Sequence, residues 1–251
     1  MDKIILKNKE EQKIVIEGGK RLSEIKHGLL EKVKVGVSAW EIEELAVELT
    51  KRSGGEVSFA KVPGYRWATC INVNEGIVHG IPKKEVVFQK GDIVSVDVGL
   101  FYEGFNTDTS FSVGLDVDSE TQKFLNVGKD TLDKAIAKVV KGNHIYDISE
   151  VIERNLRDNN YNPVRALVGH GVGRQLHEGP QIPQFIVDKR VQTPEIVVGS
   201  VLAVEIIYST GSGEIKHASD GWTIVTKDGK ISALYEDTIC VTENGSLNVT
   251  R

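Results

Sequence analysis

Cysteine is scarce in this sequence, because 251 residues contain only Cys70 and Cys240, which lie far apart and form no C-x-x-C pair. Neither a disulfide framework nor a cysteine-rich zinc site is therefore expected. No apolar run approaches the roughly 18 residues of a membrane-spanning helix. The N-terminal segment is charged from its second residue and lacks the apolar core of a signal peptide, so the cytoplasm is the expected location.

Positive charge is not in excess either, since the chain has a formal net charge of −5. This balance argues against nucleic acid as the main partner. Low-complexity tracts are absent, and 40% hydrophobic with 27% charged residues is the composition of a soluble globular protein with a substantial core. Length and composition leave open whether the chain forms one domain or two.

A helix–break–helix pattern occurs twice. In the first copy, apolar spacing predicts a helix over residues 12–34 and another that starts at Ser38, where Glu41 completes a capping box, and ends at Gly54-Gly55.

The second copy has a predicted helix over residues 119–140, a break at Gly142-Asn143 and a helix over residues 146–156. Asp147 and Glu150 are the residues expected to form its capping box.

An offset of 106 residues aligns identical or similar residues around the two breaks, and strand-like segments follow each copy. We therefore expect an α+β fold built from a duplicated unit, with two halves about a pseudo-two-fold axis and a site where the halves meet. Chance similarity between two common helix pairs is the alternative. The period is too long for a solenoid.

Acidic residues interrupt strands that are otherwise apolar. After Gly91, alternating valines predict a strand with Asp97 on its other face, and a turn at Glu103-Gly104 predicts a hairpin whose second strand carries Asp108. The two carboxylates should lie nearly across from each other, about 5 Å apart. Like charges so placed are destabilising unless a proton or a cation lies between them.

The second copy repeats this feature, because Glu205 interrupts the apolar run 201–207 and Glu236 lies in a strand after the Asp228-Gly229 turn. Four strand carboxylates with one histidine are a ligand set suited to two divalent transition ions, about 3.5–4 Å apart. Any one of these acids could instead face solvent or form a salt bridge. Their recurrence in both copies favours the metal site.

The segment GHGVGRQLHEGP, residues 169–180, places His170 and His177 among glycines. A helix is disfavoured there because each interior glycine costs about 1 kcal/mol relative to alanine. A flat strand would put the two histidines on opposite faces. They can share a site only if the chain bends between them, and a surface loop with incidental histidines is the alternative.

The sequence resembles type I methionine aminopeptidases, members of the pita-bread fold family, over essentially its whole length. The fold implied is a pseudo-symmetric α+β sandwich with an antiparallel sheet and helices outside. It would form one catalytic domain, residues 1–251, with halves of about 1–115 and 116–251. The matching segments are CINVNEGIVHGIP (70–82), DIVSVDVGLFYEGFNTDTS (92–110), GHGVGRQLHEGPQIP (169–183), AVEI (203–206) and DGWTIVTKDGKISALYEDT (220–238).

The resemblance also implies site residues. Two divalent ions, chosen among Co, Mn, Fe, Ni and Zn, would be held by five ligands, of which Asp108 and Glu236 bridge the ions. His79 and His177 would contact the scissile peptide, and Glu205 would be the general base. The full ligand set is Asp97, Asp108, His170, Glu205 and Glu236, and the methionine pocket is Phe59, Tyr65, Cys70, Leu176 and Trp222. By composition alone these pocket residues could equally belong to the core.

The implied reaction is metal-assisted hydrolysis that removes the initiator methionine from nascent chains with a small second residue. Partners would be the nascent N-terminal peptide and the ribosome near its exit tunnel, and a monomer that binds neither membrane nor nucleic acid is expected. One alternative is an X-Pro aminopeptidase or prolidase, which usually carries an extra N-terminal domain. The other is a pita-bread binding module without metals, against which the retention of all five ligand types argues.

Three segments depart from the family pattern. Ala203-Val204-Glu205-Ile206 replaces the usual Thr-x-Glu-Pro, Glu236-Asp237-Thr238 replaces Glu-His-Thr, and Lys61-Val62 replaces a Gly-Tyr pair. No ligand is lost. We therefore expect these changes to affect metal preference, rate or the shape of the site beyond the methionine pocket.

Overall fold

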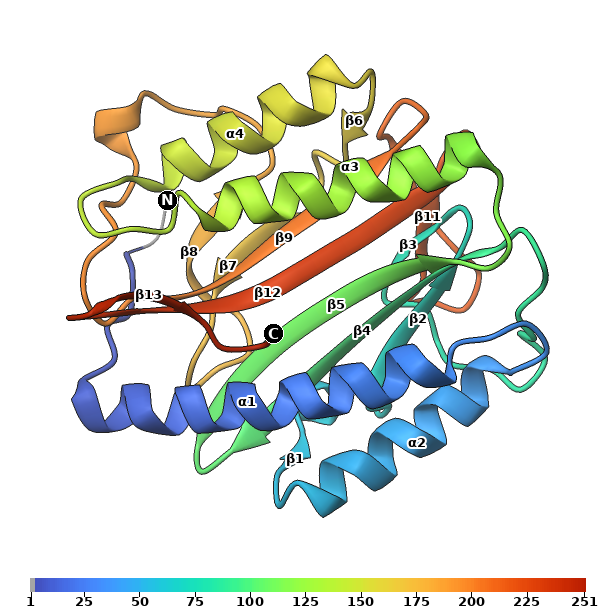
Figure 1. The fold of residues 1–251 in the computed structure, drawn as a ribbon, viewed down its shortest axis with the longest axis horizontal. Helices are drawn as coiled ribbons and strands as arrows, with labels where there is room; N and C mark the ends of the chain where they lie inside the picture. Colours follow the sequence, from blue (N-terminus) through green and yellow to red (C-terminus); the bar gives the residue numbers. More distant parts are fainter. Residues whose placement is uncertain (1–2) are drawn as a thin grey trace.

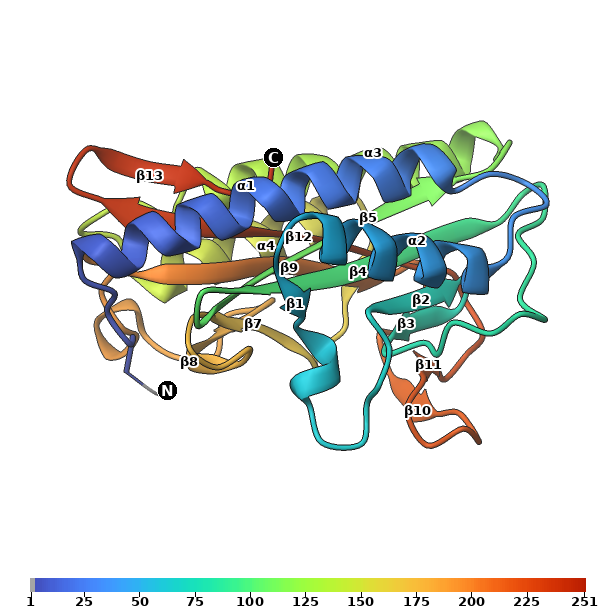
Figure 2. The same ribbon diagram turned by 90° about the horizontal axis from the view of Figure 1, so that it is seen from below.

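Helices lie on one side of a large antiparallel sheet (Figure 1, Figure 2). The computed structural model describes residues 3–251. Helix α1 crosses strands β4 and β5, α3 crosses β9 and β12, and each has a second helix beside it (Figure 1). The helices are α1 (Lys9–Lys32), α2 (Ala39–Arg52), α3 (Ser119–Ile136) and α4 (Ile145–Asp158).

The main sheet has ten strands in the order β1-β4-β5-β12-β9-β7-β8, with β2, β6 and β13 paired to β4, β9 and β12. A small second sheet has the order β10-β11-β3. The strands are β1 (Glu56–Val57), β2 (Thr69–Val73), β3 (Gly76–Val78), β4 (Ile93–Tyr102), β5 (Phe105–Gly114), β6 (Asn162–Pro163), β7 (Val168–Gly171), β8 (Glu178–Pro183), β9 (Val201–Ser209), β10 (Ile215–His217), β11 (Ile224–Thr226), β12 (Ser232–Thr242) and β13 (Gly245–Asn248). Short 3-10 turns occur at Phe59–Lys61 and Arg190–Gln192.

Capping residues determine where the first two helices begin. The Ser38 hydroxyl accepts a hydrogen bond from the Glu41 N–H at 3.3 Å, and the Glu41 carboxylate accepts one from the Ser38 N–H at 2.9 Å. The predicted capping box is therefore confirmed. Helix α1 begins earlier than predicted, because Asn8 and Glu11 form another capping box upstream of the apolar stripe.

Helix α4 corrects the prediction made for the second copy. It begins after His144, and Asp147 occupies its third position, where the carboxylate accepts a hydrogen bond from the His144 N–H at 2.7 Å. The predicted pairing of Asp147 with Glu150 is therefore wrong, because Asp147 is the third residue of the helix rather than its cap. Helix α3 ends at Ile136, before the predicted end at residue 140.

The two copies of the repeat share backbone geometry at their breaks. Gly36 and Gly142, aligned by the 106-residue offset, have φ values of 86° and 90°. Residues with a side chain rarely adopt this conformation, which explains glycine at both positions. Each glycine N–H donates to a carbonyl further along its own copy, Phe88 and Ile196, at 2.9 Å. The α+β class with a duplicated helix pair is confirmed.

Alternation along the strands gives the sheet two different faces. Val94, Val96 and Val98 of β4 pack in one apolar cluster with residues of α1 and α2. The even-numbered residues of β9, from Leu202 to Tyr208, pack with α3 and α4. Because successive side chains point to opposite faces, the residues between them lie on the face away from the helices.

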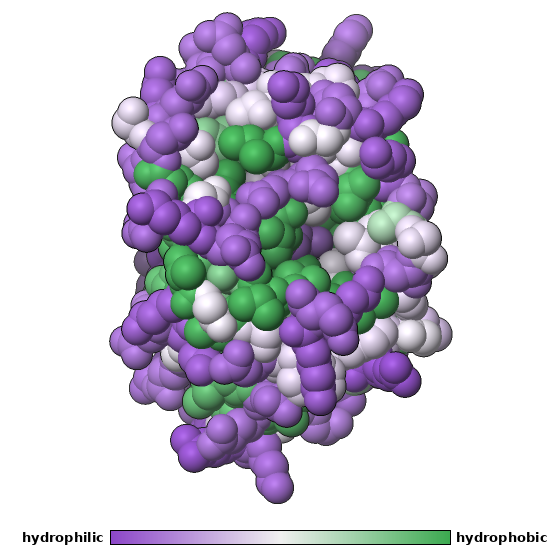
Figure 3. All heavy atoms as spheres, turned by 90° about the vertical axis from the view of Figure 1, so that its right-hand side faces the viewer, coloured by the Kyte–Doolittle hydropathy of each residue, from purple (hydrophilic) through white to green (hydrophobic). Residues whose placement is uncertain are grey.

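One end of the molecule, the right-hand side of Figure 1, shows apolar side chains surrounded by hydrophilic ones (Figure 3). Large apolar residues on the surface include Val35, which follows α1, and Val87, which precedes β4, with exposed fractions of 51% and 40%. Scattered exposed apolar residues are normal on a protein surface. Within residues 3–251, no helix combines the length and apolar character needed to cross a membrane.

Candidate functional site

A row of acidic side chains crosses the sheet on the face away from the helices. Asp97 of β4 pairs with Ser110 of β5, Ser110 pairs with Glu236 of β12, and Glu236 pairs with Glu205 of β9. Directly paired residues in antiparallel strands point to the same face. The sheet register alone therefore brings three carboxylates from both copies of the repeat into one line.

Asp108 lies diagonally to this row. The hairpin turn places Tyr102 opposite Phe105, so that Asp108 pairs with Gly99 and not with Asp97. The predicted near-opposite arrangement of Asp97 and Asp108 is thus wrong: Ser110 lies opposite Asp97, because the hairpin is centred between Glu103 and Gly104 and not one residue earlier. The two aspartates still share a face. Burial, and then the charge of Asp97, raise the pKa of Asp108 well above its usual range.

His170 completes the cluster from strand β7, where it pairs with Ala203 of β9. Its Nε2 lies 4.0 Å from Asp108 Oδ2 and 3.9 Å from Glu236 Oε1. Its Nδ1 lies 2.8 Å from the Gly171 carbonyl, which can only accept a hydrogen bond, so Nδ1 carries the proton. Burial lowers the pKa of His170 to about 3, so the ring stays neutral and the lone pair of Nε2 is available to a metal ion between it and the carboxylates.

The residues of this cluster suit a divalent cation. One ligand atom each from Asp108, His170 and Glu236 lie within 4.8 Å of one another. Buried oxygens of Asp97 and Glu236 have no hydrogen-bond partner. Within residues 3–251, no lysine or arginine pairs with the four carboxylates, although buried charges need partners. Carboxylate oxygens with one imidazole nitrogen are ligands for divalent transition metals.

The chain bends between His170 and His177, as the sequence requires if both are to serve one site. β7 and β8 pair antiparallel, and the two imidazole rings lie edge to face with centroids 4.6 Å apart. His79, after β3, adopts a positive φ of 58°. Burial, and then the neighbouring His177, lower the pKa of His79.

A buried ion pair that sequence reasoning missed holds the loop that carries His177. Lys7 Nζ lies 2.6 Å from Glu178 Oε2, with side-chain exposures of 3% and 2%. The other Glu178 oxygen accepts a hydrogen bond from the Gln175 N–H at 3.0 Å. The acid directly after His177 in a glycine-rich segment was the available signal, but nothing in the sequence connects it to Lys7.

A cavity of about 480 Å³ contains the whole arrangement. It is lined by every metal-ligand, catalytic and pocket residue predicted from sequence: Phe59, Tyr65, Cys70, His79, Asp97, Asp108, His170, Leu176, His177, Glu205, Trp222 and Glu236. Val62, one of the departures named from sequence, also lines the cavity. Further lining residues, which sequence reasoning missed, are Val78, Ala166, Leu167, Val168, Glu178, Gly179, Gln181, Ile207 and Leu234.

An aromatic cluster forms one end of this cavity. Tyr65 packs edge to face against Trp222 and Trp67, with ring centroids 5.1 Å apart in both pairs, and against Phe59 at 6.5 Å. Val62, one of the departures from the family pattern, packs against this cluster and lines the cavity. The departure therefore leaves that wall apolar.

Glu43 of α2 anchors the strand that leads into this wall. Its buried carboxylate accepts hydrogen bonds from the Ala68 N–H at 2.7 Å, the Thr69 N–H at 3.0 Å and the Thr69 hydroxyl at 2.7 Å. The Tyr65 hydroxyl donates to the Thr69 carbonyl at 2.8 Å. Glu43 thereby fixes the segment between Tyr65 and Cys70 from outside the cavity.

Ala203 and Ile206, the two departures from the family pattern beside Glu205, have side chains on opposite faces of β9. Ile206 is fully buried in the apolar cluster beneath α3 and α4, so it faces away from the carboxylates. Ala203 pairs with His170 and offers it no polar side chain.

Comparisons with known proteins agree with this geometry. Residues 15–243 match the model of metallopeptidase family M24. A methionine aminopeptidase of Clostridium perfringens is 37% identical over 243 residues, which cover 96% of both chains. The structure of a methionine aminopeptidase from Thermotoga maritima matches with a TM-score of 0.94 and 37% identity over 99% of each chain. The pita-bread fold expected from sequence is thus confirmed.

A prolidase from Pyrococcus furiosus also matches, with a TM-score of 0.75 and 20% identity over 98% of this chain and 65% of the prolidase. At this identity the likeness concerns the fold alone.

Protonation of Asp97 should contribute to the pH dependence of the stability of the metal-free protein. Burial raises its pKa to about 7, from an ordinary 3.8. A raised pKa in the folded state adds stability below the ordinary value, and this contribution is lost as pH rises through about 7. In chelator, the difference between the melting temperatures of the parent and of Asp97→Asn should therefore change with pH. The parent should lose stability relative to the variant as pH rises from about 4 to about 8. Added Mn²⁺ should reduce this loss in the parent. Parallel plots of melting temperature against pH for the two proteins in chelator would contradict the raised pKa of Asp97.

Replacement of Glu43 by glutamine should destabilise the protein. The amide keeps one acceptor oxygen but directs an NH₂ group toward a backbone N–H donor, so a buried donor loses its partner. We expect a loss of about 1–3 kcal/mol in the free energy of unfolding, measured with urea. The control is Glu48→Gln on the same helix, since Glu48 is exposed and pairs only with Arg52; it should change stability by less than about 0.5 kcal/mol. Equal effects of the two substitutions would show that the Glu43 contacts are dispensable.

Proposed function

Because the chain belongs to metallopeptidase family M24, we infer that its cavity binds the N-terminus of a polypeptide and that it is a methionine aminopeptidase, a metal-dependent hydrolase that removes the initiator methionine. The observation that carries this conclusion is the juxtaposition of an apolar aromatic wall with a row of unpaired buried carboxylates in one cavity. The wall accepts the methionine side chain, and the carboxylates lie where the first peptide bond would be held.

The proposed cofactor is a pair of divalent ions, which Asp97, Asp108, His170, Glu205 and Glu236 would hold, and Asp108 and Glu236 are the carboxylates that would be shared by both ions. The support is that oxygens of Asp97 and Glu236 lack hydrogen-bond partners and that His170 offers a neutral Nε2. Such ions, when bound, lower the pKa of a water molecule and polarise the peptide carbonyl. Fe, Mn, Co, Ni and Zn all accept these ligands.

Glu205 is the proposed general base. In the metal-free protein, burial, and then the charge of Asp97, raise its pKa well above the usual range. A carboxylate beside the attacking water can accept the proton of that water. The same carboxyl can then pass that proton to the departing amine nitrogen. Glu205 borders the cavity, where it remains half-buried and open to the substrate.

His79 and His177 are proposed to contact the scissile peptide. The lowered pKa of His79 keeps its ring neutral near pH 7, so it can donate a hydrogen bond to the peptide without adding a charge near the cations. His177 is exposed at the cavity, and its loop is held by the Lys7–Glu178 pair. Both histidines would position the bond and stabilise the tetrahedral intermediate.

Phe59, Tyr65, Cys70, Leu176 and Trp222 are the proposed pocket for the methionine side chain. Burial raises the pKa of the Cys70 thiol, so it stays neutral. An apolar, aromatic pocket of this kind favours an unbranched thioether side chain over a charged one.

We further propose that residues 1–251 work as one catalytic domain of two halves, about 1–115 and 116–251, and as a monomer. The support is that one cavity takes residues from both halves. Because the proposed substrate is the N-terminus of a nascent chain, we expect the enzyme to act in the cytoplasm, near the ribosomal exit tunnel. The decisive assay is release of free methionine from Met-Ala-Ser with Mn²⁺, compared with chelator and with an X-Pro peptide. Preference for the X-Pro peptide would instead favour a prolidase-like enzyme.

The two histidines of the glycine-rich segment should fail in different ways. His177→Ala should lower kcat while metal affinity stays at the parental value, because its role is to contact the substrate. His170→Ala should weaken Mn²⁺ binding, measured by calorimetry, because a ligand is lost. If both substitutions weakened Mn²⁺ binding alike, His177 would have to be counted as a ligand.

Glu205→Gln should lower kcat by roughly 10² to 10⁴, the usual contribution of general acid–base catalysis. The amide oxygen remains available to a metal, so partial Mn²⁺ occupancy should persist, whereas Glu205→Ala should lose it. Steady-state kinetics on Met-Ala-Ser, paired with metal analysis of the same samples, separate the two defects. Near-parental turnover by the glutamine variant would remove Glu205 from the role of base.

A further inference from the structure

The boundary between strands β5 and β12, here called the seam, joins the two proposed halves with few backbone hydrogen bonds. The strands share one registered pair, Ser110 with Glu236, whereas β4 and β5 pair continuously from Ile93 to Tyr102. Asp108 and Glu236, the carboxylates proposed to be shared by both ions, lie on the two sides of this seam. Their spacing therefore needs another source of support.

Side-chain hydroxyls replace the missing ladder bonds. The Thr238 hydroxyl accepts from the Asp108 N–H at 3.0 Å and donates to the Asp108 carbonyl at 2.8 Å. The Thr109 hydroxyl donates to the Glu236 carbonyl at 2.8 Å. The backbone of each shared carboxylate is thus held by a threonine of the opposite strand.

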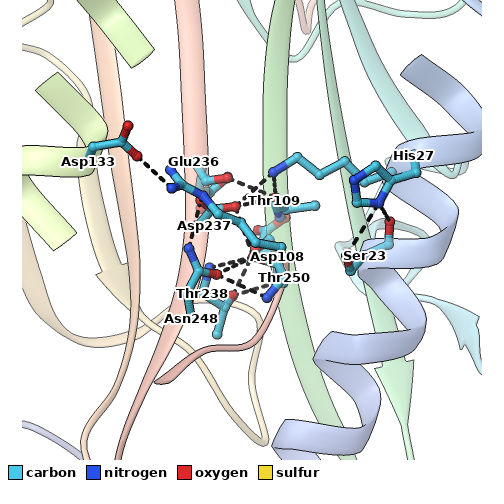
Figure 4. A network of polar contacts seen from close by, with 12 residues as sticks. Ser23, His27, Asp108, Thr109, Asp133, Glu236, Asp237, Thr238, Asn248 and Thr250 are labelled. Atoms are coloured by element: carbon cyan, nitrogen blue, oxygen red, sulfur yellow. Dashed lines mark hydrogen bonds and ion pairs between the residues drawn. The ribbon is translucent and has the colours of Figure 1, made fainter. Parts of the chain in front are cut away.

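A buried ion pair on the helix face joins the same two strands (Figure 4). Asp237 is 0% exposed, and its Oδ1 lies 2.7 Å from Lys26 Nζ of helix α1. The same Lys26 Nζ donates to the Thr109 hydroxyl at 2.9 Å. One ammonium group therefore connects Thr109, the neighbour of Asp108, with Asp237, the neighbour of Glu236.

The remaining lone pairs of Asp237 are also satisfied. Its carboxylate accepts from Asn248 Nδ2 at 2.9 Å, from the Thr250 hydroxyl at 3.1 Å and from Arg251 Nε at 2.6 Å. Asp237 thus places a buried negative charge directly after Glu236. A buried carboxylate held by so many donors has one well-defined position.

We propose that the Lys26–Asp237 ion pair is a positioning element of the metal centre. It fixes the separation of β5 and β12 at Thr109 and Asp237, and thereby the separation of the Asp108 and Glu236 carboxylates on the opposite face. Neighbouring residues of a strand point to opposite faces, so a backbone shift at Thr109 or Asp237 moves the carboxylate beside it. The proposal rests on the metal-ligand roles of Asp108 and Glu236 given above.

The test compares Lys26→Met and Asp237→Asn with Lys20→Met, a control on the exposed face of the same helix. Calorimetry measures Mn²⁺ affinity, and hydrogen exchange in chelator measures the amides of residues 107–112 and 233–239. Both seam variants should bind Mn²⁺ about ten- to a hundredfold more weakly, the usual effect of losing a residue that supports a ligand. Their amides should exchange faster in both segments. Lys26→Arg, which keeps the charge, should retain most of the affinity, and Lys20→Met should match the parent.

A double variant, Lys26→Met with Asp237→Asn, guards against misfolding, because it leaves neither member of the pair as an unmatched charge. It should fold and still bind Mn²⁺ more weakly than the parent. Seam variants that melt earlier yet bind Mn²⁺ like the parent would overturn the proposal and leave the pair a purely structural role. If the parent itself bound no Mn²⁺, the metal-dependent function would fail. The exchange data in chelator would then still decide whether the pair holds the seam.

Discussion

The register across strands β4, β5, β12 and β9 is the constraint on which the rest of the structure depends. It aligns Asp97, Glu236 and Glu205 on one face, with Asp108 a diagonal step away. Burial raises the pKa of all four, so they cannot all ionise in the folded protein unless cations lie between them. On the opposite face, two apolar clusters beneath the helices and the Lys26–Asp237 pair between them hold these strands in place. The close approach of these carboxylates therefore destabilises the folded protein unless protons or cations offset their charges.

Local features of the fold could be predicted from sequence because they depend on near neighbours. The alternation of apolar and polar residues predicts the strand that carries Asp97, and the capping residues predict the start of α2 after Ser38. The turn at Glu103-Gly104 is predicted correctly, but an error of one residue in the centre of a hairpin moves each partner by two residues, so Asp97 lies opposite Ser110 and not Asp108. No sequence pattern predicts the contact between Lys7 and Glu178, because the two residues are 171 positions apart. The ligand set itself came from resemblance, since no local pattern specifies which strands adjoin.

The departures from the family pattern lie in different parts of the structure, and their positions distinguish their effects. Ile206 belongs to the core beneath α3 and α4, where proline or isoleucine is equally remote from the substrate. Val62 replaces an aromatic residue within the cavity wall, so it is the departure placed to alter substrate fit. Asp237 lies on the helix face but adjoins Glu236, a proposed ligand, and its carboxylate pairs with Lys26 and Arg251. Sequence comparison alone gives these three changes equal weight.

The proposed metal ligands come from five strands spread along the chain, from Asp97 on β4 to Glu236 on β12. A growing polypeptide cannot assemble this set until the ribosome has released β12 and the strand has entered the middle of the sheet. The proposed metal centre is therefore incomplete in any nascent copy of this chain whose β12 has not yet joined the sheet. An enzyme that acts on the N-termini of unfinished proteins thus depends, in its own unfinished form, on the folding of β12.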